Sequence, residues 1–127
     1  MRGRLHHVVL DCSDPDELAG FYSALLGQPI TYHSPDWVVV AENDRSSGLA
    51  FQPVPHYLPP MWPEGTPGQQ LHLDVMVADV DAADEWVIAL GGRRLPSDLP
   101  DSHVYSDPAG HPFCLIRKPD WAPDLED

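Results

Sequence analysis

The chain has 127 residues, of which 43% are hydrophobic, and its 20 acidic and 7 basic side chains give a formal net charge of −13. This length suits one hydrophobic core rather than two independent ones. The shortage of Lys and Arg argues against binding to nucleic acid or to an anionic membrane surface, because both need cations to neutralise phosphates.

The first residues lead directly into a strand-like segment, with no apolar leader before it and no stretch of membrane-spanning length. Cys12 and Cys114 are the two cysteines, too few for a disulfide framework. We therefore expect a cytoplasmic protein whose thiols are reduced.

A strand is expected over residues 6–12, because apolar and polar side chains alternate there. The alternation assigns Val8, Leu10 and Cys12 to the face that packs on a helix. His6 has the same parity and is expected on that side as well. The opposite face carries His7, Val9 and Asp11.

Helix signals follow at once. Asp14 is a good N-cap, and Pro15 suits the first helical position. Gly27 is the expected C-terminal stop. Between them, apolar side chains recur at helical spacing and predict a core-facing stripe of Leu18, Phe21, Tyr22 and Leu25.

Three short strands are expected next, over about 29–33, 36–42 and 48–53. Residues 54–69 contain many prolines and show neither helical nor strand periodicity. We interpret this segment as a linker, either an extended strap or a wall over a ligand site. Trp62 is its candidate ligand-contacting side chain.

The second half of the chain repeats the first at an offset of 65 residues. The identities are His7 and His72, Asp14 and Asp79, Ala24 and Ala89, Leu25 and Leu90, and Gly27 and Gly92. A repeat of this size predicts one supersecondary unit used twice.

The repeated unit predicts a strand over 71–77 and a helix capped by Asp79 and stopped at Gly91, with Trp86 in its core-facing stripe. Short strands are expected near 93–95, 103–106 and 113–117. On the first of these strands, His72 and Asp74 share the face turned away from the helix.

The expected fold is α+β, with two tandem βαβββ modules that form a curved, mostly antiparallel sheet around a cavity. The expected organisation is a single domain over 1–127. Its parts are a first module over about 5–53, the linker over 54–69, a second module over about 70–118 and an acidic tail over 119–127.

Two βαβββ units, the segment D-P-D-E-L-A-G-F-Y-S-A-L-L-G and the closing D-P-A-G-H-P-F-C-L resemble the vicinal oxygen chelate superfamily. That superfamily includes glyoxalase I, extradiol dioxygenases, fosfomycin-resistance enzymes and bleomycin-binding proteins. The chain is most similar to small actinobacterial-type glyoxalase-like proteins. The resemblance covers nearly the whole chain and implies the fold more strongly than a reaction.

The resemblance implies four ligand positions facing the cavity, which fall on His7, Gln52, His72 and Cys114. In metal-dependent relatives these positions are usually His, Gln or Glu, and glyoxalase I has glutamates where Gln52 and Cys114 stand, so an authentic glyoxalase I is not expected. His7 and His72 are the leading candidate metal ligands, with Gln52 and Cys114 as further ones. Imidazole and thiolate favour Zn²⁺ over Mn²⁺ or Mg²⁺.

Asp74 lies two residues beyond His72 on the same face, about 7 Å along the strand. It is a candidate base or second ligand that replaces the missing acid, or else a structural partner for His7 or a backbone amide. The ligand pocket is therefore expected to be lined by His7, Gln52, His72, Asp74, Cys114 and Trp62.

The sequence predicts a glyoxalase-like small-molecule-binding protein or enzyme of unknown substrate. One alternative is a non-catalytic antibiotic-binding protein of the bleomycin-resistance type. Another is an atypical metal-dependent lyase or dioxygenase-like enzyme. The expected partners are a small-molecule ligand and a second copy of the chain in a homodimer.

Overall fold

A computed structural model describes residues 1–98 and 102–125 of the chain. The chain divides into two compact units, Met1–Leu58 and Pro59–Asp127, called here the first unit and the second unit. The expectation that residues 1–127 act as one domain stays a prediction. Residues 126–127 of the predicted tail lie outside the described residues.

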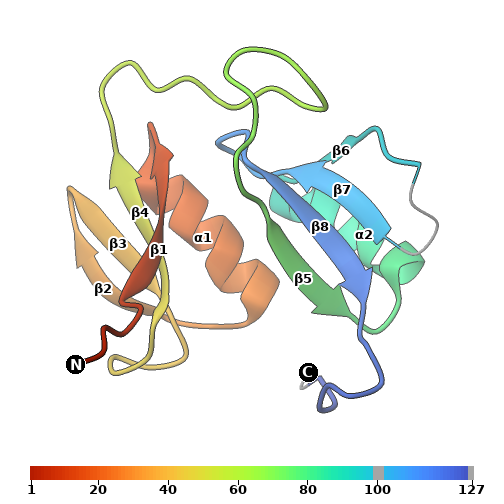
Figure 1. Cartoon of the computed structure of the whole chain (residues 1–127), viewed down its shortest axis with the longest axis horizontal. Helices are drawn as coiled ribbons and strands as arrows, with labels where there is room; N and C mark the ends of the chain where they lie inside the picture. The colour runs from red at the N-terminus through yellow and green to blue at the C-terminus, as the bar shows by residue number, and fades with distance from the viewer. Residues whose placement is uncertain (99–101, 126–127) are drawn as a thin grey trace. The chain divides into compact units, whose positions relative to one another are not determined.

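The first unit contains β1 (His7–Cys12), α1 (Pro15–Leu26), β2 (Ile30–Ser34), β3 (Trp37–Val40) and β4 (Gly48–Pro53). Its strands form a sheet in the order β1-β4-β3-β2. The β1–β4 pair is parallel, and the other two pairs are antiparallel. Figure 1 shows α1 on one face of this sheet.

The second unit repeats this plan with β5 (Leu73–Val77), α2 (Val80–Leu90), β6 (Arg93–Leu95), β7 (Ser102–Ser106) and β8 (Pro112–Arg117). The strand order is β5-β8-β7-β6, again with the first and last strands parallel. α2 lies on one face of the sheet (Figure 1). The predicted α+β fold with two βαβββ modules is therefore confirmed, with each module forming its own mixed four-stranded sheet.

Both helices begin and end where the sequence predicts. The Asp14 carboxylate accepts a hydrogen bond from the Glu17 backbone N–H at 3.1 Å, and Gly27 ends α1 in the left-handed region at φ 62°. Asp79 caps α2 through two backbone N–H groups, and Gly91 ends it at φ 118°. Capping depends on residues adjacent in sequence, so the pattern alone located these boundaries.

The core of each unit lies between the helix and the facing side of its sheet. In the first unit, the buried Tyr22 ring stacks on Phe51 of β4 with 5.7 Å between ring centroids. In the second unit, Tyr105 of β7 stacks on Phe113 of β8 at 5.5 Å. Aromatic pairs of this kind stabilise a core beyond the area they bury.

Two expectations, one about burial and one about strand length, are wrong. Trp86 was assigned to the core-facing stripe of α2, but 43% of its surface is exposed. The apolar stripe predicted from the helical period is wider than the part of α2 that is buried. Val87 is the only residue of α2 that is buried. The predicted strand over 71–77 is also shorter, because Leu71 and His72 lie before β5.

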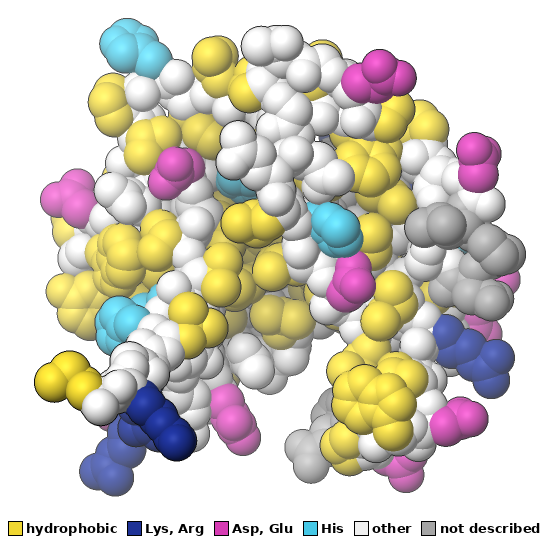
Figure 2. All heavy atoms as spheres, viewed as in Figure 1, with side chains coloured by type: hydrophobic (Ala, Val, Ile, Leu, Met, Phe, Trp, Pro, Cys, Tyr) yellow, Lys and Arg dark blue, Asp and Glu magenta, His cyan; other side chains and the backbone are white. Residues whose placement is uncertain are grey.

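Acidic side chains lie at several separate places on the face drawn in Figure 2, rather than in one patch. This distribution fits a dispersed surface charge. Neither helix within residues 1–98 and 102–125 is long and apolar enough to cross a membrane.

Candidate functional site

The second unit brings together a compact group of possible ligating side chains, His72, Asp74 and Cys114. One donor atom from each lies within 4.8 Å of the other two. The parallel register sets Asp74 of β5 directly opposite Cys114 of β8. The His72 Nε2 atom lies 3.4 Å from the Asp74 carboxylate. Three of the residues singled out from the sequence are therefore neighbours in space.

The β7–β8 turn fixes where β8 begins and hence where Cys114 lies. The buried Asp107 carboxylate accepts hydrogen bonds from the Ala109 and His111 backbone N–H groups at 2.9 and 3.0 Å. The Asp107 N–H donates to the His111 carbonyl at 2.9 Å. The D-P-A-G-H segment thus sets the geometry of the turn, and His111 contributes through its backbone.

The Cys114 thiol lies at the buried side of this cluster, while His72 and Asp74 are exposed. Burial raises the pKa of the Cys114 thiol, and the negative charge of Asp74 and a hydrogen bond to Asp74 raise it further. The thiol is therefore protonated near neutral pH, and a metal ion would have to displace that proton.

His7 in the first unit has a different environment. Its Nδ1 atom accepts a hydrogen bond from the Gly48 backbone N–H at 3.0 Å. Its ring lies against that of His6, with centroids 4.0 Å apart. Burial lowers the pKa of His7, and the neighbouring His6 lowers it further. Each effect favours the neutral imidazole.

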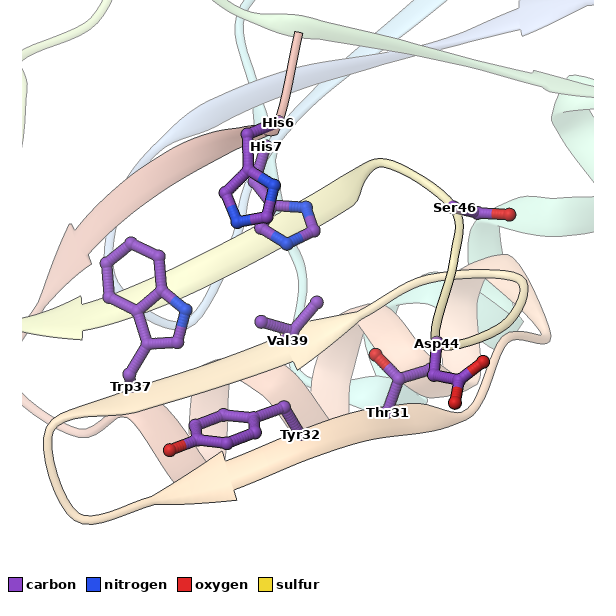
Figure 3. A pocket seen from close by; sticks show the side chains of 8 residues that line it. All are labelled: His6, His7, Thr31, Tyr32, Trp37, Val39, Asp44 and Ser46. Carbon is purple, nitrogen blue, oxygen red and sulfur yellow. The ribbon is translucent and has the colours of Figure 1, made fainter. Parts of the chain in front are cut away.

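Figure 3 shows His6 and His7 within a pocket of about 450 Å³ in the first unit, with Trp37 at one end and Asp44 at the other. The expectation that His6 faces the helix is wrong. His6 precedes β1, so the strand alternation does not constrain its side chain. The sequence analysis missed several residues that line this pocket, because it looked for site residues on the first and last strands of each module. The missed residues come from β2 and the β3–β4 loop: Thr31, Tyr32, Asp44 and Ser46.

Gln52 is an exposed residue of β4, opposite Asp11 in the register, whereas Gly48 is opposite His7. Gln52 is therefore four residues from the His7 position, about 13 Å along the strand. The position of β4 that corresponds to Cys114 is Ala50, because Ala50 pairs with Val9 as Cys114 pairs with Asp74. A role for Gln52 as a ligand stays a prediction.

The half-buried Trp62 lies in the proline-rich segment and is held within the second unit. Its indole Nε1–H donates to the Pro96 carbonyl at 3.0 Å. Pro59 of the same segment also packs closely, since a Cβ at Gly110 would lie 2.6 Å from the Pro59 side chain. The contact of Trp62 with a ligand stays a prediction.

A family model described as a glyoxalase-like domain matches residues 7–116. This match spans most of the chain, so the protein belongs to the glyoxalase-like domain family. It confirms the resemblance on which the sequence prediction relied. A comparison with curated protein sequences finds no match.

Solved structures agree with this fold. A glyoxalase-related enzyme from Fulvimarina pelagi is 20% identical, with a TM-score of 0.69 over 95% of this chain and 92% of that one. A glyoxalase/bleomycin resistance protein/dioxygenase family enzyme from Burkholderia phytofirmans PsJN is 17% identical, with a TM-score of 0.67 and coverages of 91% and 98%.

A variant of the fosfomycin resistance protein FosX from Listeria monocytogenes is 18% identical, with a TM-score of 0.65. The match covers 91% of this chain and 90% of that one, and that structure was solved with Mn(II) and 1S,2S-dihydroxypropylphosphonic acid. At these identities the likeness establishes the shared fold.

Proposed function

We propose that the protein binds a small molecule beside a divalent metal ion held by His72, Asp74 and Cys114. The observation that carries this proposal is the approach of the three donor atoms to within 4.8 Å of one another. Protein ligands gathered this closely, with solvent access on one side, suit a metal that keeps a position open for an exogenous ligand.

The donor set supports zinc as the metal. Thiolate and imidazole are good zinc ligands, and a carboxylate oxygen completes a common zinc set. Mn²⁺ and Mg²⁺ prefer oxygen donors. FosX was solved with Mn(II), and Cys114 is the feature that favours a different metal here.

The chain's own residues have separable roles in this proposal. Cys114 supplies the buried donor, and the Asp74 carboxylate accepts a hydrogen bond from its thiol. Asp74 is exposed, so it can pass the thiol proton on to solvent, and its carboxylate then remains available as the second donor. His72 lies beside the same carboxylate and supplies the third donor. A bound metal would polarise an oxygen of the ligand as a Lewis acid.

Metal analysis of untagged protein after zinc reconstitution and desalting tests the proposal. We expect close to one equivalent of zinc, and a sulfur-to-metal charge-transfer band after replacement by Co²⁺. Cys114→Ser and Asp74→Asn should each lower the bound zinc. The control is Cys12→Ala, which removes the other cysteine and should leave zinc binding unchanged.

The proposal fails if reconstituted protein retains less than about a tenth of an equivalent, because a zinc site with three protein donors is expected to keep its metal through desalting. It also fails if Cys12→Ala lowers zinc binding as much as Cys114→Ser does. A circular dichroism spectrum of each variant separates loss of ligand from loss of fold.

The narrower hypotheses differ in what happens to the bound molecule. An antibiotic-binding protein releases its ligand unchanged, whereas a metal-dependent lyase or dioxygenase-like enzyme releases a product. Mass spectrometry of a ligand recovered from the zinc-loaded protein distinguishes them.

The homodimer stays a prediction, which light scattering in solution tests. The cytoplasmic location also stays a prediction, which cell fractionation tests.

A further inference from the structure

The pocket of the first unit holds a histidine whose protonation pattern is set by the backbone. The Gly48 N–H donates to the His7 Nδ1 atom at 3.0 Å, so Nδ1 must present a lone pair. A neutral imidazole that accepts at Nδ1 carries its proton on Nε2. Burial and the adjacent His6 lower the pKa of His7 and so favour this neutral form.

Gly48 makes this hydrogen bond where only glycine fits. A Cβ atom at this position would overlap the Val40 carbonyl oxygen and lie 2.7 Å from the Ala41 Cβ. The close packing of β4 against the end of β3 thus fixes the N–H group that His7 accepts from. Ligation of a metal through Nε2 would need the proton on Nδ1, where it would point at the Gly48 N–H.

The second unit lacks this constraint. Continued one residue back, the register that pairs Leu73 with Phe113 sets His72 opposite Pro112. Proline has no N–H to donate. Where Asp74 and Cys114 stand beside His72, the first unit has the apolar Val9 and Ala50. The two equivalent histidines therefore have different chemical partners.

Aromatic rings line the first-unit pocket together with His7. Trp37 and Tyr32 come from β3 and β2, His6 lies against His7, and Val39 forms part of the pocket wall (Figure 3). Tyr32 is 56% exposed although it is a large ring. Flat aromatic walls suit a planar ring system, and a volume of about 450 Å³ accommodates a compound of that kind.

We propose that the first-unit pocket binds a planar ring compound whose carbonyl-type oxygen accepts a hydrogen bond from His7 Nε2–H, and that His7 does not ligate the metal. Asp44 at the far end of the pocket disfavours an acidic group on the ring there. This proposal goes beyond the proposed function and does not depend on its metal.

Nitrogen-15 NMR of histidine-labelled protein tests the protonation pattern. We expect His7 to show an unprotonated Nδ1 and a protonated Nε2. Zinc should shift the His72 signals and leave those of His7 in place. A protonated Nδ1 on His7, or a zinc-induced shift of its ring nitrogens, overturns the proposal. If zinc shifts neither histidine, the metal centre of the second unit fails while the first-unit site stands.

Coumarin is the binding probe, because it is a planar bicyclic compound with one ring carbonyl and no charge. Its matched control is 2H-chromene, which lacks the carbonyl. We expect coumarin to perturb the His7 Nε2–H and Trp37 indole signals and to bind about ten-fold more tightly than 2H-chromene, the difference made by one hydrogen bond. Equal affinities, or no perturbation by coumarin up to about 2 mM, overturn the proposal.

Variants of His7 complete the test. His7→Phe keeps a ring but removes the donor and should lower coumarin affinity about ten-fold. His7→Gln restores an N–H donor and should recover part of it. His33→Phe, an exposed histidine paired with Asp16, is the control and should bind as the wild type does. Loss of affinity in His33→Phe equal to that in His7→Phe overturns the assigned role.

Discussion

The two units have the same strand order, and in each the helix begins at an Asp cap and ends at a Gly. They differ in how many helix side chains are buried and in what the equivalent histidines, His7 and His72, contact. α1 buries five side chains and α2 buries only Val87. His7 accepts a backbone hydrogen bond, whereas His72 lies beside a carboxylate and a thiol. A repeated fold thus keeps its backbone plan while separate residues assign different chemistry to each copy.

The largest expected effect tests the difference in helix burial. Leu25 and Leu90 occupy the same position of the repeat, but Leu25 is 6% exposed and Leu90 is only partly buried. Leu25→Ala should lower the free energy of unfolding by about 2–5 kcal/mol because it leaves a cavity. Leu90→Ala should cost clearly less. Urea denaturation measures both, and equal losses would contradict the difference in burial.

The next effect tests the close approach at Gly48. Gly48→Ala should destabilise the protein by about 1–3 kcal/mol, since a Cβ there overlaps backbone. Gly20→Ala is the matched control, because Gly20 lies inside α1 with nothing within 4 Å of its Cβ direction. The control should stabilise the protein by about 0.5–1 kcal/mol. Thermal unfolding of the pair gives the comparison, and a neutral Gly48→Ala would remove the steric argument.

A third prediction concerns a hydrogen bond that the first unit lacks. The buried Tyr105 hydroxyl donates to the Asp84 carboxylate at 2.5 Å, and the corresponding first-unit residues are the apolar Val40 and Ala19. Burial raises the pKa of Tyr105 well above 10.0, and the hydrogen bond to Asp84 raises it further. Tyr105→Phe should lower the free energy of unfolding by about 1.5 kcal/mol near neutral pH, the lower end of the range for a hydrogen bond to a charged group.

The same contact predicts an alkaline pH dependence. A tyrosine whose pKa is raised on folding stabilises the native state fully below its unfolded value of 10.0 and loses that contribution as the pH rises further. Stability should therefore fall above about pH 10 by up to ~1.4 kcal/mol per pH unit. Tyr105→Phe should remove this slope, and Tyr32→Phe should keep it. A slope unchanged in Tyr105→Phe would show that another group titrates.

The smallest expected effect tests the role of Pro112. The β5–β8 register, continued one residue back, sets His72 opposite Pro112, as Gly48 is opposite His7. Pro112→Ala would supply a backbone N–H at that position. That N–H should compete for the imidazole and weaken zinc binding about ten-fold, the lower end of the range for changed partners of a ligating histidine. A competition titration with a chromophoric chelator measures it. Unchanged affinity would show that the backbone partner does not distinguish the two histidines.

Much of the fold follows from local sequence. Asp14 and Gly27 mark the ends of α1, and Asp79 and Gly91 those of α2, because caps act within one turn. The alternation along β1 correctly predicted that Val9 and Asp11 are exposed and that Leu10 and Cys12 are buried. Burial of whole elements was less predictable, since the exposure of Trp86 depends on how closely α2 packs on its sheet.

For the candidate site too, some features follow from the sequence and others from the tertiary structure. The sequence by itself determined that His7 and His72 occupy equivalent positions of the repeat and that Asp74 lies two residues beyond His72. The assignment of Cys114 to a ligand position came from the resemblance and stays a prediction. Only the tertiary structure decided that Asp74 lies opposite Cys114 and that Gly48 donates to His7. These contacts join residues about 40 positions apart, and the register that aligns them is set by packing across the sheet rather than by neighbouring residues.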